Sequence, residues 1–305
     1  MQVLTIGEVL WDVFPAQEFL GGAPLNFSAN IVRLGDRAAL ISAIGRDARG
    51  HSAEEAITQL GVDTPFLQRV TDAPTGVALI STGPTGEPHF EIPRPAAFDY
   101  ITLSPVALAS AASLEPDWFY FGTLLQTSPH VEHITQRLVE TLPGTRRFYD
   151  MNLRNGCWNL ELVQRLSSLA TVLKLNEAEA RTLGVRTGMS PDSFSLEHFC
   201  AEWASAHQLD CICVTLGPDG CMIYEAGDVL TVPGYAAVVQ DTVGAGDAFA
   251  AAFLHGYHRR WTTQRTARFA NALGSIVASR AGAIPPWTLD ECLALASRTT
   301  SNPRP

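Results

Sequence analysis

The sequence is short of positive charge and contains a single lysine. Its 305 residues carry 21 lysines and arginines against 31 aspartates and glutamates, so the formal net charge is −10 at pH 7. This balance argues against a nucleic-acid partner, because proteins bind nucleic acids through lysine and arginine contacts to phosphates. The lone Lys174 is not preceded by glycine, which excludes the Gly-Lys-Ser/Thr loop of P-loop nucleotide-binding proteins.

Long apolar runs, a charged leader and paired cysteines are lacking as well. No hydrophobic stretch reaches membrane-spanning length, and MQVLTIGEVLWDVF at the N-terminus has neither a positive segment nor a small-residue cleavage site. We therefore expect a cytoplasmic protein that does not enter a membrane. The cysteines have no CxxC spacing and are interpreted as buried free thiols, with Cys211 and Cys213 on one face of a strand: 157, 200, 211, 213, 221 and 292. The pairs His130/His133 and His255/His258 lack a neighbouring HExxH-type acid and are interpreted as surface histidines.

Strand patterns alternate with helical patterns along most of the chain, which predicts an α/β fold with a mainly parallel sheet. We expect one domain over residues 1–305. The predicted strands are 3–7, 38–45, 118–122, 146–152, 171–176 and 211–217. The predicted helices are 25–34, 51–60, 129–141, 159–168, 195–206, 245–258, 264–281 and 287–298.

One region breaks this alternation. Residues 66–91 contain short strand patterns separated by turn residues, with no helix between them. We expect a small β-flap, formed by about 10–20 and 65–94, that lies over one edge of the sheet as a lid; a hairpin without a function is the alternative. Apolar Val77, Leu79 and Phe90 on the flap leave open a monomer or a homodimer joined through the lid. The polar residues 299–305 are expected to fray.

The stretch DTVGAGDAFAAAF, residues 241–253, indicates an anion site that contains a carboxylate. Its glycines open a helical pattern, and the first N–H groups of a helix are unpaired and carry the positive end of the helix dipole. Phe249 stands where a dinucleotide fingerprint needs a third glycine or alanine, which disfavours a Rossmann dehydrogenase. Asp247 is then either a carboxylate that caps the helix or a base that accepts a proton beside a transferred phosphoryl group.

These residues resemble the C-terminal signature of the ribokinase-like (PfkB) sugar kinases, whose pattern is roughly D-T-x-G-A-G-D-x-F. The glycine-rich GGAPLNFSANIVRLGD, residues 21–36, resembles a second signature of the same family. The resemblance covers essentially the whole chain. It implies a three-layer α/β/α fold with a mainly parallel sheet and a small β-flap lid.

The resemblance also implies roles around the anion turn. Asp247 is expected to act as the general base, and Gly244, Ala245 and Gly246 to form the anion hole. Asp241 matches a position beside a monovalent-cation site, to which the loop 279–285 contributes backbone carbonyls. A potassium requirement stays open, because carbonyl ligands leave little trace in side-chain identity.

The sugar is expected to bind to the N-terminal half of the chain. The matching positions for sugar contacts are Asp12, Gly21, Gly22 and Asn26, since a carboxylate and an amide each bind hydroxyls and glycines admit the ring. Arg94 and Arg154 match arginines that reach substrate or phosphate, and a guanidinium suits either. A turn-forming role for Asp12 and solvent exposure for both arginines are the alternatives.

The nucleotide is expected at a second set of positions. Asn176 and Glu179 reproduce an N-x-x-E motif that helps place the magnesium of Mg·ATP, with Glu179 acting through water; a helix N-cap at Asn176 is compatible with this role. Thr215 and Gly217 resemble a turn that contacts the nucleotide. Asn271 lies where a late helix borders the adenine pocket.

The sequence therefore indicates an ATP-dependent sugar kinase with Mg2+ as cofactor and a small sugar as substrate. By resemblance D-fructose is the first substrate and 2-keto-3-deoxygluconate the second. Val243 and Met151 depart from the family pattern, and Met151 weakens the subfamily assignment more than the activity. A non-catalytic sugar-binding regulatory protein is the alternative from another class.

Overall fold

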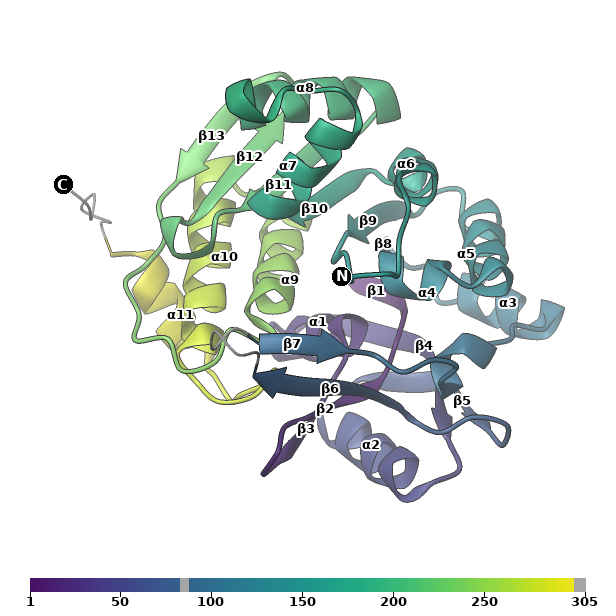
Figure 1. The fold of residues 1–305 in the computed structure, drawn as a ribbon. Helices are drawn as coiled ribbons and strands as arrows, with labels where there is room; N and C mark the ends of the chain where they lie inside the picture. Colours follow the sequence, from purple (N-terminus) through teal and green to yellow (C-terminus); the bar gives the residue numbers. More distant parts are fainter. Residues whose placement is uncertain (83–87, 299–305) are drawn as a thin grey trace.

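The computed structural model describes residues 1–82 and 88–298, and the side chains of 81–90 are left out of the description. The expected frayed tail, 299–305, and the tip of the flap, 83–87, lie outside the described residues. Helices cover both faces of a large twisted sheet, and a second, smaller sheet lies along one side of it (Figure 1). The predicted three-layer α/β fold is confirmed.

Within the described residues the main sheet has nine strands. Their spatial order is β13 (Asp228–Val232), β12 (Cys221–Glu225), β11 (Cys211–Thr215), β10 (Val172–Asn176), β9 (Arg146–Asp150), β8 (Trp118–Gly122), β1 (Gln2–Ile6), β4 (Arg37–Gly45) and β5 (Asp63–Val70). All neighbours from β11 to β5 pair in parallel, whereas β12 and β13 form an antiparallel hairpin at the far edge. All six predicted strands are present, and the β12–β13 hairpin is an addition to the predicted set.

The helices divide between the two faces of this sheet, which is possible because successive side chains of a strand point to opposite faces. In β8, Phe119 and Phe121 belong to one core, and Trp118 and Tyr120 belong to the other. The first core is covered by α3 (Pro105–Ala112), α4 (Thr123–Gln126), α5 (Pro129–Thr141), α6 (Leu160–Leu169), α7 (Glu177–Arg186) and α8 (Leu196–His207). The second is covered by α1 (Ala23–Arg33), α9 (Ala245–His258), α10 (Thr263–Ala278) and α11 (Leu289–Ala296).

A smaller core forms where α1 and α2 (Ala48–Gln59) pack on β4. Short 3-10 turns occur at Ala97–Tyr100, Pro191–Ser193 and Gly217–Asp219. The cysteines are free, and Cys211 and Cys213 lie in the second core on the same face of β11, as predicted.

The second sheet is made of β3 (Glu18–Gly21), β2 (Leu10–Val13), β6 (Gly76–Thr82) and β7 (Pro88–Glu91), in that order. The expected flap differs from it in one respect: residues 63–70 form β5, which pairs in parallel with β4 in the main sheet. The reason is that β5 follows β4 and the helix α2 as a crossover unit, which places it next to β4 and buries Phe66 in the first core. The flap is therefore smaller than predicted.

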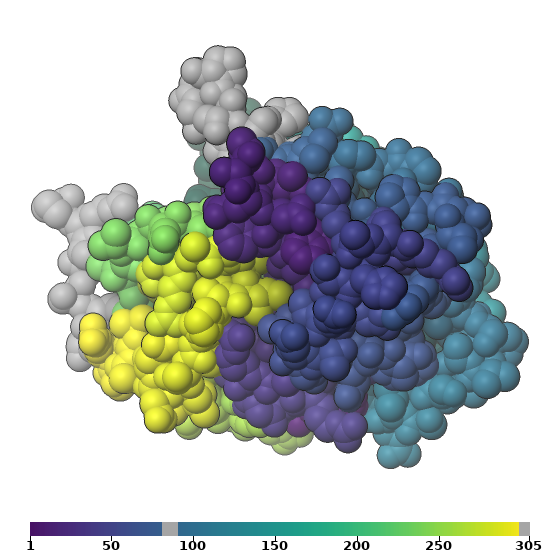
Figure 2. Space-filling model, turned by 90° about the horizontal axis from the view of Figure 1, so that it is seen from below, coloured from purple at the N-terminus to yellow at the C-terminus, as the bar shows by residue number. Residues whose placement is uncertain are grey.

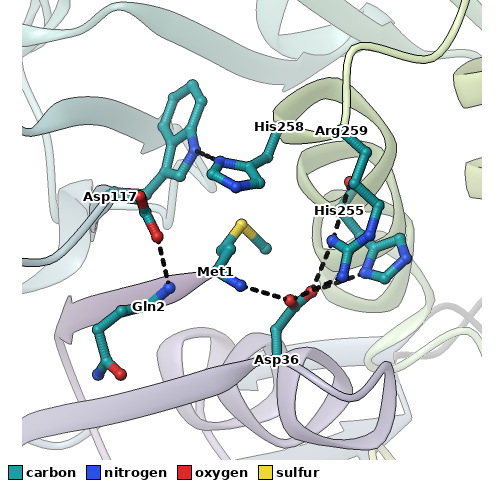
Figure 3. A network of polar contacts seen from close by, with 8 residues as sticks. Met1, Gln2, Asp36, Asp117, His255, His258 and Arg259 are labelled. Atoms are coloured by element: carbon teal, nitrogen blue, oxygen red, sulfur yellow. Dashed lines mark hydrogen bonds and ion pairs between the residues drawn. The ribbon is translucent and has the colours of Figure 1, made fainter.

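A polar network fixes the far end of α9, the helix that begins with the anion turn (Figure 3). The buried Asp36 accepts hydrogen bonds from Met1 N at 2.8 Å, from Arg259 at 3.0 and 3.1 Å, and pairs with His255 Nδ1 at 2.7 Å. Burial disfavours the charged Asp36, but these hydrogen bonds hold its pKa well below the usual range. The surface prediction for His255 is wrong, because this ring is buried against Asp36.

The last part of the chain lies against the first part. In the view from below, the yellow C-terminal surface adjoins the purple N-terminal surface (Figure 2). Trp287 Nε1 donates to Asn30 Oδ1 at 2.7 Å, and Arg33 donates to the carbonyl of Pro285 at 2.6 Å. Both partners in the N-terminal part belong to α1, so the helix that carries Asn26 is tied to the loop after α10.

Candidate active site

The anion turn is held in place by the loop that follows α10. Gly244 has a φ of 78°, and a Cβ on it would lie 2.2 Å from the carbonyl oxygen of Ala283, so only glycine fits here. The Asp241 carboxylate accepts hydrogen bonds from Val243 N at 3.0 Å and from Gly282 N at 3.1 Å. The expected neighbourhood of Asp241 and the loop 279–285 is therefore present.

The first turn of α9 has no side-chain cap. Ala245 N donates to the carbonyl of Thr242 at 3.3 Å, and the N–H groups of Gly246 and Asp247, like others at the start of a helix, are available to an anion. Asp247 lies in this turn and is buried, but the hydrogen bond that it accepts comes from Asn26 Nδ2 at 2.8 Å. This contact does not fit a capping carboxylate. It joins the two signature motifs, which are 221 residues apart.

The environment of Asp247 keeps its proton affinity high. Burial and the negative charge of Asp150 raise the pKa of Asp247 to about 6, although Lys174, the hydrogen bond from Asn26 and the charge of Arg154 act in the opposite direction. A carboxylate with a pKa near neutrality is suited to accept a proton from an alcohol during a reaction.

Asp12, Gly21 and Asn26 converge next to this carboxylate. A Cβ on Gly21 would lie 2.7 Å from Asp12 Oδ2 and 3.6 Å from Asn26 Oδ1, so both oxygens border the same spot. Asn26 Oδ1 is buried and has no hydrogen-bond partner in the described part of the chain. Burial and the charge of Asp247 raise the pKa of Asp12 to about 7. The site thus offers several acceptor atoms that need donors, as a polyol would provide.

The two arginines differ in what they contact. Arg154 is exposed, lies near the carboxyl groups of Asp12 and Asp247, and lowers the pKa of both. The guanidinium of Arg94 is already engaged: it donates to Asp99, to Thr127 and, at 3.0 Å, to the carbonyl oxygen of Leu124. These contacts already use most of the guanidinium donors of Arg94, and the substrate contact expected of it stays a prediction.

The residues expected to contact the nucleotide lie at the carboxyl ends of β10 and β11. Asn176 and Thr215 are paired neighbours there, and Gly217 begins the turn that follows β11. Asn176 caps α7 and exchanges reciprocal hydrogen bonds of 2.8 Å with Glu179. The other oxygen of Glu179 accepts from Leu153 N at 2.7 Å. Asn271 lies on α10, and its amide donates to the carbonyls of Val232 and Pro233 at the end of β13. In the structure it therefore connects α10 to β13.

No group of three or more His, Cys, Asp and Glu side chains that could hold a metal ion occurs in the described residues. A magnesium ion that is carried by nucleotide phosphates keeps several waters and needs few protein ligands, so the role expected of Glu179 stays a prediction.

A family model for pfkB family carbohydrate kinases matches residues 7–290. This chain belongs to the pfkB family of carbohydrate kinases. Similar proteins include probable fructokinase-2 of Arabidopsis thaliana, which is 29% identical over 96% of this chain and 94% of its own length. Probable fructokinase-4 of the same plant is 30% identical over 93% of this chain and 92% of its own.

Solved structures share the fold of this pfkB kinase. Fructokinase from Xylella fastidiosa with bound ATP aligns with a TM-score of 0.83 and 23% identity, over 96% of this chain and 97% of that one. An E. coli protein assigned as ribokinase II, in complex with ATP and Mg2+, aligns with a TM-score of 0.84 and 22% identity, over 98% and 99%. Within the described residues, no helix of the kinase is long and apolar enough to cross a membrane.

Sequence reasoning missed a buried ion pair under the anion turn of this pfkB kinase. Lys174 Nζ contacts Asp150 Oδ1 at 2.9 Å, and Tyr120 donates to the other Asp150 oxygen at 3.0 Å. A Cβ on Gly246 would lie 3.2 Å from Lys174 Nζ, so the ammonium group is directly below the turn. The signal in the sequence was the occurrence of a single lysine, inside an apolar strand pattern.

Glu8 was missed as well. It is buried, its Oε1 accepts from Ala23 N at 3.3 Å, and burial raises its pKa to about 7. Its backbone oxygen would lie 2.4 Å from a Cβ on Gly22, whose φ is 110°. Glycine at position 22 therefore allows Glu8 to approach the start of α1.

Proposed function

We propose that this pfkB kinase transfers the γ-phosphoryl group of ATP to D-fructose. The single observation that carries the proposal is the position of Asp247: it is buried in the uncapped first turn of α9 and held by Asn26 beside Asp12. An anion site for the phosphoryl group and an acceptor site for sugar hydroxyls therefore meet at one carboxylate. The similarity to fructokinases over nearly the full length supports fructose as the sugar.

In the proposed reaction, Asp247 accepts the proton of a sugar hydroxyl. The hydroxyl oxygen then forms a bond to the γ-phosphorus of ATP while the bond from that phosphorus to the bridging oxygen breaks, and ADP leaves with the electron pair. The N–H groups of Gly244, Ala245 and Gly246, with Lys174 below them, stabilise the negative charge of the phosphoryl group.

The donor set fits Mg·ATP. Lys174 and the uncapped turn provide positive charge for phosphates, and Thr215 and Gly217 lie beside Asn176 at the same edge of the sheet. Asn176 and Glu179 would hold the magnesium ion, and Glu179 would do so through water because both of its oxygens already accept backbone N–H groups. The ion supplies charge neutralisation to the phosphates when it is bound.

A sugar acid is a poorer substrate for this arrangement. Glu8, Asp12 and Asp247 place carboxyl groups around the sugar position, and Arg94 is occupied by Asp99. Only Arg154 would remain to compensate the carboxylate of 2-keto-3-deoxygluconate. We therefore rank fructose above the sugar acid, and we assign Arg154 to substrate binding and Arg94 to support of the neighbouring loop.

The proposed function is tested by measuring ADP release with Mg·ATP in the presence of fructose, 2-keto-3-deoxygluconate, ribose, tagatose, adenosine or no sugar. Fructose is expected to give the highest kcat/KM. Turnover only with another sugar would replace fructose as the substrate. Sugar binding by calorimetry without any ADP release would support a non-catalytic binding protein instead.

Four further properties are proposed. A monovalent cation next to Asp241 predicts faster turnover in potassium than in sodium, since Asp241 joins the anion turn to the loop 279–285. The second sheet is proposed to act as a lid, and Leu79 on it is exposed. Light scattering distinguishes a monomer from a homodimer joined through this sheet. A reaction that consumes ATP is expected in the cytoplasm.

A further inference from the structure

A small cavity lies between the start of α1, the end of β8 and the loop after β9. Its walls include Glu8, Tyr120, Thr123, Leu124, Asn152 and Arg154, and its volume is about 10 Å³. Such a volume corresponds to roughly one water molecule or one hydroxyl group. The cavity adjoins the candidate active site, because the charge of Arg154 also lowers the pKa of Asp12 and of Asp247.

Asn152 provides a hydrogen-bond donor without an acceptor. Its Nδ2 atom is buried and has no partner among the residues that the structure describes. Its backbone has a φ of 44°, in the left-handed region that asparagine tolerates better than most residues. A buried unpaired donor lowers stability, so its retention is explained most simply by an acceptor that arrives with a ligand.

The surrounding backbone forces Asn152 into this position. On one side Met151 N donates to the carbonyl of Lys174 at 2.9 Å, and on the other Leu153 N donates to Glu179 Oε1 at 2.7 Å. The hydrogen bonds on both sides therefore hold Asn152 in its left-handed conformation. Such strained residues, held by their surroundings, are typical of functional sites.

Glu8 supplies the complementary group. One of its oxygens accepts from Ala23 N at 3.3 Å, and Glu8 lines the same cavity as Asn152. A hydroxyl group that donates to a carboxylate and accepts from an amide nitrogen would satisfy both side chains at once.

We propose that Glu8 and Asn152 determine sugar specificity by binding one hydroxyl group of the substrate, which donates to the Glu8 carboxyl group and accepts from Asn152 Nδ2. This inference rests on the proposed sugar kinase function and assigns it two further binding residues. They are distinct from the residues around the phosphoryl-transfer site, Asp247 and the anion turn.

The test uses Asn152→Gly, which removes the amide and relaxes the backbone, Asn152→Ala, which removes the amide alone, and Glu8→Gln. Asn155→Ala in the exposed turn that follows Asn152 and Glu55→Gln on the surface of α2 are the matched controls. Each protein is assayed with fructose, with its epimers at carbons 3, 4 and 5, and with 1-deoxyfructose. The KM for ATP and the Tm are measured for each.

Asn152→Gly and Glu8→Gln are expected to lower kcat/KM for fructose by about 10- to 100-fold, which corresponds to the loss of a buried hydrogen bond. One analogue, altered at the hydroxyl that the cavity binds, should be disfavoured by the wild type and used as well as fructose by both variants. Controls should match the wild type, and the KM for ATP should stay the same. A uniform loss on all sugars, or unchanged selectivity, would overturn the inference.

Calorimetry without ATP separates this inference from the proposed function. A wild-type protein that binds these sugars but releases no ADP would refute the kinase proposal, and the selectivity of binding would still decide the roles of Glu8 and Asn152. Absence of binding by the wild type to every sugar in the panel would refute both.

Discussion

Asp247 is buried, and its burial has opposite effects on stability and on its proposed role as the general base. Its pKa lies at about 6 in the folded protein, above the ordinary value of 3.8. Between these two values the folded protein binds more protons than the unfolded chain, so stability falls as the pH rises through this window. Activity changes in the other direction, because only the ionised carboxylate accepts a proton.

We expect kcat/KM to fall about tenfold per pH unit below pH 6, as Asp247 becomes protonated. Asp247→Asn should lower kcat by about 100- to 10,000-fold and raise the free energy of unfolding at pH 8 by up to about 3 kcal/mol. Its stability advantage should shrink toward pH 4. Urea unfolding at both pH values measures this, and Asp290→Asn, in the exposed first turn of α11, is the control. An Asp247→Asn protein that is less stable at pH 8 would contradict the argument.

Lys174 also stabilises two buried carboxylates, those of Asp150 and Asp247. Burial opposes its charge, but Asp150 and Asp247 raise its pKa above the usual value. Lys174→Met should cost about 3 to 5 kcal/mol, because it leaves Asp150 buried without a counter-ion. The acid limb of the pH profile should also move to higher pH, since Lys174 holds the pKa of Asp247 down.

The double variant Asp150→Asn with Lys174→Met removes both charges and should recover part of the lost stability. Chemical denaturation and the pH dependence of kcat/KM measure the two effects. Equal stability of the single and double variants would show that the pair is not coupled in this way.

Residue types and spacing led to Asp247, Asn26 and Asp12, which the structure brings together. They could not reveal that Arg94 contacts Asp99, Leu124 and Thr127, because these contacts depend on how separate loops fold. The sequence did not identify Glu8 and Lys174 as site residues for a similar reason. Lys174 lies in an apolar strand pattern and Glu8 in the loop between β1 and β2, and each becomes part of the site only through neighbours from distant segments, such as Asp150 for Lys174 and Ala23 for Glu8.

At the scale of elements, the turn before α9 depends on its contact with the loop after α10. Gly244→Ala would introduce both a left-handed alanine and a clash with the carbonyl of Ala283. We expect it to displace the first turn of α9 and to lower kcat by more than about tenfold, since the anion-hole N–H groups shift.

Gly227→Ala is the matched control, because its φ of 91° is also positive but a Cβ would meet nothing within 4 Å. This variant should lose about 1 to 2 kcal/mol of stability with unchanged kcat. Thermal unfolding and steady-state kinetics on both proteins separate the strain from the clash. Equal kinetics in the two variants would argue against a special role for the turn.

The parallel strands and most helices were predictable, because their apolar patterns are long and each is followed by the next element of a crossover unit. The sheet to which β5 belongs was not, since an edge strand and a hairpin strand have the same local pattern. Its sheet is decided by its register with β4, in which Ile41 is opposite Phe66. The β12–β13 hairpin was missed at the other edge of the same sheet.

For the molecule as a whole, Asp36 joins α9 to the first residues of the chain. It contributes stability above its unfolded pKa, and this contribution is lost as the pH falls, because its folded pKa is depressed. Asp36→Asn should cost about 2 to 4 kcal/mol at pH 7 and less at pH 3, where the loss of this contribution has begun but is incomplete. The control Asp63→Asn, in an exposed pair with Arg37 at 3.5 Å, should cost less than about 1 kcal/mol. Tm values at both pH values test this, and equal losses in the two variants would contradict it.

The hydrogen bond between Asn26 and Asp247 also has a consequence for synthesis on the ribosome. Its partners are 221 residues apart. At ordinary elongation rates, roughly 10 to 40 seconds separate their appearance. During that interval Asn26 has been synthesised but Asp247 has not. Gly244 in turn is synthesised before Ala283, which it contacts in the folded protein. Both contacts therefore form only after the strands of the main sheet, the last of which is β13, have been synthesised.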